Sequence, residues 1–167
     1  NPKNTLTFGL HSTYYDFKPA VSSFTSGGIS GSLGVPNKYA LENAIYIGNE
    51  QKVKKKVILQ YGLRFSTFQY LGKGTAYEYM DANYALDSKV LTDSTTYGSF
   101  KTIADYYNLE PRFSVKIDVD SASSVKASYN RMTQYLHLMS NTAAATPLDI
   151  WSPSTNNIKP QLADQFA

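Results

Sequence analysis

The feature that most constrains this chain is a strict alternation of apolar and polar side chains between residues 57 and 65. One set holds Val57, Leu59, Tyr61, Leu63 and Phe65, and the other holds Gln60, Gly62 and Arg64. Successive side chains of a β-strand point to opposite faces, so a period of two predicts a strand with one apolar and one polar face. Only Ile58 breaks the division.

The same period predicts four further strands, at residues 5–14, 39–47, 111–119 and 125–130. Residues 120–123 form a polar Asp-Ser-Ala-Ser sequence that predicts a tight turn, so the last two segments are expected to pair as a hairpin. Residues 161–167 predict the beginning of another strand. The chain is therefore expected to be all-β.

Composition agrees with this fold class and excludes several functions. The 14 Tyr and 8 Phe residues favour strands. The net charge is only +3, and the short basic run at Lys52 and Lys54–Lys56 is interpreted as a solvated turn, so no nucleic acid partner is expected. Cysteine is absent, which excludes disulfides and thiolate metal sites. No cofactor or metal is expected.

The lengths of the predicted connections alternate along the chain. Residues 18–37 form a long Gly- and Ser-rich connection, residues 49–56 a short basic turn, and about forty residues separate Phe65 from Pro111. The short turn at Asp120 follows, and a long polar stretch comes after Tyr135. Mean hydropathy is −0.35, and no apolar run is long enough for a membrane helix. Short turns at one end and long loops at the other are typical of outer-membrane barrels.

The sequence thus predicts an antiparallel up-and-down transmembrane β-barrel segment with five to six strands. Because so few strands cannot close a barrel, residues 1–167 are expected to be part of a larger one. The side chains expected to face lipid are Leu6, Phe8, Leu10, Val57, Leu59, Tyr61, Leu63, Phe65, Phe113, Val115 and Ile117. Those expected to face the lumen are His11, Glu42, Gln60, Arg64, Arg112, Lys116, Lys126 and Asn130.

Two other classes remain open from the residues alone: a passive porin-like barrel and a soluble β-sandwich used for binding or adhesion. A sandwich would bury the row from Leu59 to Phe65 under a second sheet. An enzyme is not expected, because the two histidines, His11 and His137, form no catalytic or metal-ligand spacing with each other. The scattered aspartates lack the spacing of a calcium loop.

Several segments resemble the late barrel of TonB-dependent receptors that carry a carboxypeptidase-regulatory-like N-terminal extension. The matching segments are Leu109–Val115, Val125–Arg131, Tyr46–Glu50, Tyr61–Phe65, Pro147–Trp151, Ile158–Gln161 and Ala163–Gln165. The resemblance implies a 22-stranded barrel in the outer membrane of a Gram-negative cell. It also implies a plug domain, not present in this chain, and coupling to TonB.

The resemblance further implies that extracellular loops capture a scarce solute and that a surface lipoprotein can act as a partner. The residues that would contact the solute are Tyr106, Tyr107, Tyr135, His137 and Trp151. Aromatic residues near a barrel rim also serve as interface anchors, which is the competing role for each of them. The loops do not distinguish among siderophores, cobalamin, oligosaccharides and peptides as the solute.

Overall fold

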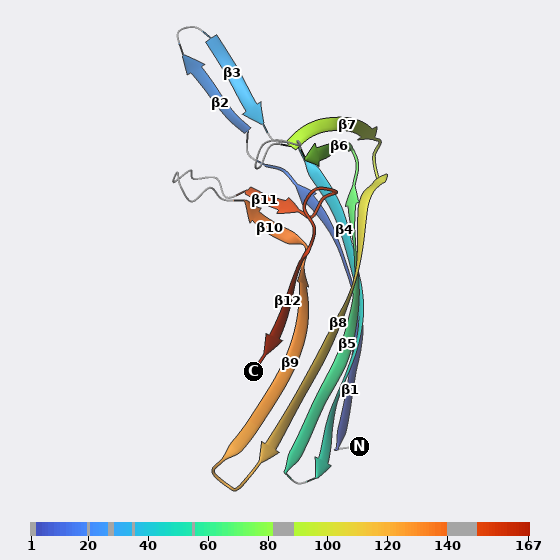
Figure 1. Ribbon diagram of the computed structural model, residues 1–167, viewed down its shortest axis with the longest axis vertical. Coiled ribbons are helices and arrows are strands. Elements are labelled where there is room, and N and C mark those ends of the chain that lie inside the picture. The colour runs from blue at the N-terminus through green and yellow to red at the C-terminus, as the bar shows by residue number, and fades with distance from the viewer. Residues whose placement is uncertain are drawn as a thin grey trace.

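Six long strands form one antiparallel sheet in the computed structural model, which describes residues 3–19, 21–26, 29–34, 36–54, 56–81, 89–139 and 150–167. Each strand lies next to its successor in the sheet, in the order β1-β4-β5-β8-β9-β12 (Figure 1). These strands are β1 (Asn4–Phe17), β4 (Lys38–Lys54), β5 (Val57–Leu71), β8 (Thr102–Asp118), β9 (Ser124–Gln134) and β12 (Gln161–Phe166). The predicted all-β antiparallel fold is confirmed. The sheet is open, with β1 and β12 at its edges.

Three small hairpins connect the long strands at one end of the sheet, opposite the short turns (Figure 1). They are β2 (Val21–Ser26) with β3 (Ile29–Gly34), β6 (Gly74–Asp81) with β7 (Lys89–Tyr97), and β10 (Leu136–Met139) with β11 (Ile150–Pro153). The three connections expected to be long therefore share one end of the sheet, which we call the hairpin end. The other end is the turn end.

The strands are longer than the alternation predicted, and three expected connections contain strand residues. The basic turn expected at residues 49–56 is mostly strand, because β4 continues to Lys54 and β5 begins at Val57. The forty residues expected to lack strands between Phe65 and Pro111 contain the end of β5, the β6–β7 hairpin and the start of β8. Residues 18–37 similarly contain the β2–β3 hairpin, and residues 140–149 lie outside the described part of the chain.

Pro111 was expected at the start of a strand but lies in the middle of β8, paired with Leu63 of β5. Proline has no N–H to donate to a neighbouring strand, so it is rare within paired strands. The pairing between β8 and β9 extends from Asp118 only to Arg112, next to Pro111. Beyond that point no described strand pairs with β8 on its β9 side, so the missing N–H costs no ladder hydrogen bond with the described residues.

The register divides the sheet into two chemically different faces, because directly paired residues share a face. Phe8, Ile47 and Leu63 form one row, and Leu10, Ile45, Phe65 and Leu109 form the next. All residues predicted to face lipid lie on this side, which we call the apolar face. All residues predicted to face the lumen lie on the opposite side, the polar face.

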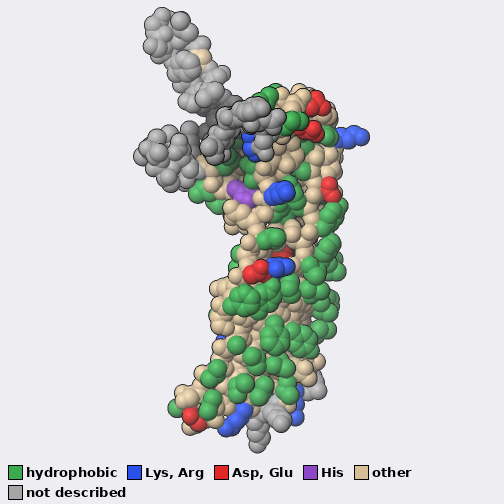
Figure 2. Space-filling model, in the orientation of Figure 1, with side chains coloured by type: hydrophobic (Ala, Val, Ile, Leu, Met, Phe, Trp, Pro, Cys, Tyr) green, Lys and Arg blue, Asp and Glu red, His purple; other side chains and the backbone are tan. Residues whose placement is uncertain are grey.

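The apolar face has no covering layer within the described residues. Phe8 is 74% exposed, Leu63 43% and Phe113 48%. Figure 2 shows hydrophobic side chains spread over the long strands from mid-height to the lower end. The only buried hydrophobic cluster, among the residues that the structure describes, is Ala40, Phe68 and Tyr135 near the hairpin end. The second sheet of a soluble sandwich is thus not seen over the row from Leu59 to Phe65.

The β8–β9 turn has the predicted position, and Asp120 organises it. Its Oδ1 accepts hydrogen bonds from the N–H groups of Ala122 and Ser123, at 2.7 and 2.8 Å. These donors hold the pKa of the Asp120 carboxyl below its usual range. The ionised Asp120 side chain therefore stabilises the turn fully above the pKa of an ordinary aspartate, and this stabilisation is lost as the pH falls through the lowered pKa.

Replacing Asp120 with alanine is expected to open this turn, because two backbone donors lose their acceptor. Amide hydrogen exchange of Ala122 and Ser123 should accelerate at neutral pH, while exchange in the middle of β8 stays unchanged. Asp120→Asn is the matched control, since its side-chain oxygen keeps both bonds. Equal acceleration in both variants would contradict the role given to the side-chain acceptor.

Candidate functional site

The polar face carries a network of charges centred on Arg64 of β5. Its Nη2 donates a hydrogen bond to Oε1 of Glu42 on β4 at 3.0 Å. Its Nε lies 3.4 Å from Oε1 of Glu110 on β8, an ion-pair contact that lacks hydrogen-bond geometry. Glu110 is buried, at 5% exposure. One guanidinium therefore forms ion pairs with two carboxylates, one from the strand on either side of it.

Both carboxylates also accept hydrogen bonds from hydroxyl groups. Tyr15 of β1 donates to Glu42 at 2.9 Å, and Ser66 of β5 donates to Glu110 at 2.7 Å. Such bonds are needed because an ion pair out of water is stable only when its remaining acceptors are satisfied. The network joins four strands across the polar face and fixes the positions of the side chains around it.

Tyr135 connects this network to the chain that follows β9. Its ring stacks on Phe68 with centroids 4.7 Å apart, and its hydroxyl lies 2.7 Å from Oγ of Ser66. Asn108 donates a further hydrogen bond to the Tyr135 hydroxyl at 2.9 Å. Burial raises the pKa of Tyr135, although the bonds with Ser66 and Asn108 oppose that shift. The hydroxyl thus stays protonated at neutral pH.

Residues 135–139 and 150–158, which we call the inner segment, pack against the polar face near the hairpin end. Lys38 of β4 donates to Oγ of Ser152 at 2.9 Å, and the Tyr106 hydroxyl of β8 donates to the carbonyl of Thr155 at 2.5 Å. Within the segment, the His137 ring lies 2.9 Å from Oγ of Ser154. The inner segment therefore closes over part of the polar face.

Of the five predicted solute contacts, three come together in the structure, and the other two lie apart from them. Tyr106, Tyr135 and His137 come together, but their polar atoms bond to the inner segment or to the polar face. Trp151 is 52% exposed. Tyr107 lies on the apolar face, because it pairs with Thr67 two positions from the pair of Phe65 and Leu109. Its position fits the competing role of an interface anchor.

No family model, curated protein or solved structure matches this chain. The site is therefore interpreted from its geometry. The described residues contain no group of three or more His, Cys, Asp or Glu side chains able to hold a metal ion. They also contain no helix that is long and apolar enough to cross a bilayer.

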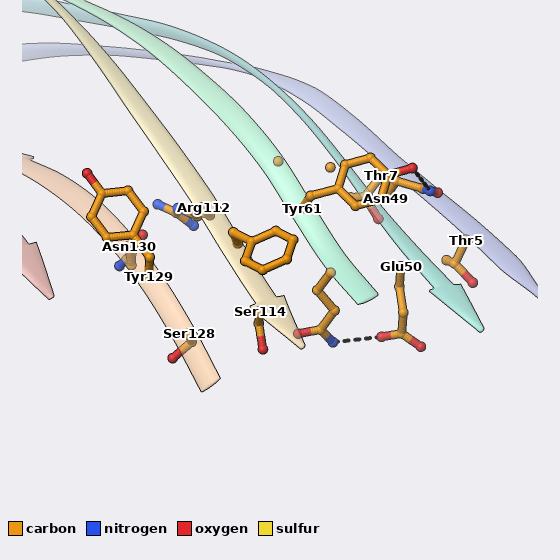
Figure 3. A pocket seen from close by; sticks show the side chains of 14 residues that line it. Thr5, Thr7, Asn49, Glu50, Tyr61, Arg112, Ser114, Ser128, Tyr129 and Asn130 are labelled. Carbon is orange, nitrogen blue, oxygen red and sulfur yellow. Dashed lines mark hydrogen bonds between the residues drawn. The ribbon is translucent and has the colours of Figure 1, made fainter. Parts of the chain in front are cut away.

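Nearer the turn end, the polar face has a hollow of about 440 Å³ (Figure 3). Gly48 of β4 and Gly62 of β5 form a direct cross-strand pair, with Thr7 of β1 paired to Gly48 and Arg112 of β8 paired to Gly62. A side chain on Gly62 would place its Cβ 3.0 Å from the carbonyl oxygen of Ile47, so β4 would have to shift by a few tenths of an ångström to accept a larger residue there. This pair could not be predicted from the sequence, because alternation within one strand does not give the register between strands.

Proposed function

We propose that these six strands are part of an outer-membrane β-barrel closed by further strands, with the apolar face in lipid and the polar face lining the lumen. The observation that carries the proposal is the exposed apolar face, which extends across the long strands with no covering layer in the described residues. In water such an apolar face would favour aggregation. In the hydrocarbon of a membrane the same face is stable. The two edge strands would pair with the further strands, because unpaired backbone groups are costly in lipid.

The position of the apolar band supports a tilted barrel. We take as its midpoint the central residue of each apolar row: Phe8 of Leu6–Leu10 on β1, Tyr61 of Val57–Phe65 on β5, and Ala127 of Val125–Tyr129 on β9. Phe8 is aligned with Leu63, which is two residues from Tyr61, and Tyr61 is aligned with Tyr129, which is two residues from Ala127. The midpoint therefore shifts by two residues from β1 to β5 and by two more from β5 to β9. The total shift is about 13 Å along the strands, while β1 and β9 are about 19 Å apart across the sheet. The ratio of these lengths corresponds to a strand tilt of roughly 35°. Strands of membrane barrels are tilted by about 35–45°.

Aromatic side chains lie near the hairpin-end border of the apolar band, as an interfacial girdle requires. The Tyr14 ring is 6.4 Å from the Tyr39 ring and 6.3 Å from the Phe100 ring. Tyr107 is exposed on the same face. These rings would occupy the headgroup level at the outer border of the band.

Within this proposal, the protein imports a scarce solute as part of a TonB-dependent receptor. Two of the segments that resemble these receptors, 109–115 and 125–131, lie on the neighbouring strands β8 and β9, and the polar face would supply the charged lumen wall. Uptake that stops when the inner membrane is de-energised would support coupling to TonB. Uptake that continues unchanged would instead indicate a passive pore.

The lipid exposure is tested with spin labels, which the absence of native cysteine makes simple. Phe113→Cys and Ser114→Cys place labels on neighbouring residues of opposite faces. In phospholipid vesicles, the label at 113 should be accessible to oxygen and shielded from a water-soluble nickel chelate. The label at 114 should show the reverse. Equal accessibility of both labels to the nickel chelate would mean that the apolar face does not contact hydrocarbon.

A further inference from the structure

Two unpaired charges of opposite sign line the hollow above Gly48 and Gly62. Arg112 makes no hydrogen bond or ion pair with any described residue, whereas the other two arginines, Arg64 and Arg131, are both paired with carboxylates. Glu50 accepts one hydrogen bond from the neutral Nε2 of Gln60, at 2.8 Å, and has no cation partner within the described residues (Figure 3). The hollow thus offers one free cationic and one free anionic group.

The glycine pair separates these charges and leaves the space between them open. Arg112 is on β8 and Glu50 is on β4, with β5 between them, so the two strands are about 10 Å apart. At Gly48 and Gly62 no side chain fills that distance. Both charged side chains line the same hollow. Figure 3 shows Arg112 directed toward Asn130 of β9, so its side chain must turn over Gly62 to meet a molecule that also reaches Glu50.

We propose that this hollow binds a small zwitterionic solute, whose carboxylate pairs with Arg112 and whose ammonium group pairs with Glu50. A planar guanidinium binds a carboxylate through two parallel hydrogen bonds, and a carboxylate side chain accepts from an ammonium group. The spacing suits a solute whose two charges are several ångströms apart, as at the two ends of a dipeptide. The inference goes beyond the membrane proposal, since binding at the polar face is measured without a bilayer.

The test uses the protein purified in detergent and titrated calorimetrically with glycylglycine. A dissociation constant in the millimolar range is expected, because the site is shallow and its ion pairs are partly solvated. Arg112→Gln and Glu50→Gln should each weaken binding about tenfold. Acetate and methylammonium, which carry one charge each, should bind at least about tenfold more weakly than glycylglycine.

A third variant removes the space and leaves the charges in place. A Cβ on Gly48 would meet only the Tyr61 carbonyl oxygen, at an ordinary 3.8 Å, so Gly48→Val should fold normally and abolish binding. Lys126→Gln changes a charge elsewhere on the same face and should have no effect. An unchanged circular dichroism spectrum shows that each variant is folded.

Three results would overturn the proposal: no glycylglycine binding to the folded protein, equal affinity for acetate alone, or binding that survives Glu50→Gln. None of them bears on the spin-label test at residues 113 and 114. Failure of the solute site is thereby separated from failure of the membrane proposal.

Discussion

Replacement of Arg64 by methionine should lower the free energy of unfolding by about 3–5 kcal/mol. The change leaves Glu42 and the buried Glu110 without their shared cation. Two carboxylates facing each other out of water repel, and neither can recover the lost interaction from solvent. The measurement is a denaturant titration of the protein in detergent, followed by tryptophan fluorescence and circular dichroism.

The matched control is Lys116→Met, which removes an ion pair of similar length in an exposed position on the polar face. Lys116 lies 2.9 Å from Asp118, but the two side chains are 43% and 36% exposed. Water screens such a pair, so the expected loss is below about 1 kcal/mol. Equal losses at Arg64 and Lys116 would show that burial does not set the strength of the Arg64 network.

A triple variant tests the cause more directly. Combining Arg64→Met with Glu42→Gln and Glu110→Gln removes the charges together, and it should recover much of the stability lost in the single variant. Ser66 and Tyr15 can still donate to the glutamine oxygens. If the triple variant is less stable than Arg64→Met, the loss comes from packing of the arginine and not from uncompensated charge.

The alternation predicted the strands correctly where one face is apolar throughout, and it failed where the buried face changes. On β5, the apolar residues occupy odd positions as far as Phe65, but Phe68 and Tyr70 occupy even positions and are buried on the polar face. The inner segment covers that part of the sheet, with Tyr135 stacked on Phe68. A reversal of phase within one run is therefore the signal that could have extended the strand and located the inner segment.

The candidate site was less predictable than the strands, because it depends on contacts between segments far apart in the sequence. The sequence predicts that Glu42 and Arg64 face the lumen, but it predicts no face for Glu110, which precedes the expected strand at 111–119. Their contacts require the register of β4 and β8 against β5. The alternation of apolar residues determines which face a residue occupies. The register between two long strands depends on all of their cross-strand pairs together.

The substitution Leu63→Arg should destabilise the protein by about 2–4 kcal/mol in a phospholipid bilayer. Leu63 lies in the apolar row with Phe8 and Ile47, within the span assigned to hydrocarbon. The charge has no acceptor there and must be desolvated or drawn toward the headgroups. Folding into vesicles at increasing urea concentration measures the effect.

Gln60→Arg is the control on the same strand, because it adds the same charge on the polar face, where Glu50 already accepts a bond from Gln60. It should leave stability within about 0.5 kcal/mol of the original protein. The comparison also separates the membrane barrel from a soluble sheet. Leu63 is 43% exposed, so if water covered that face, an arginine there would be tolerated as well as one at position 60. A large loss at position 63 alone requires that the apolar face be in contact with hydrocarbon.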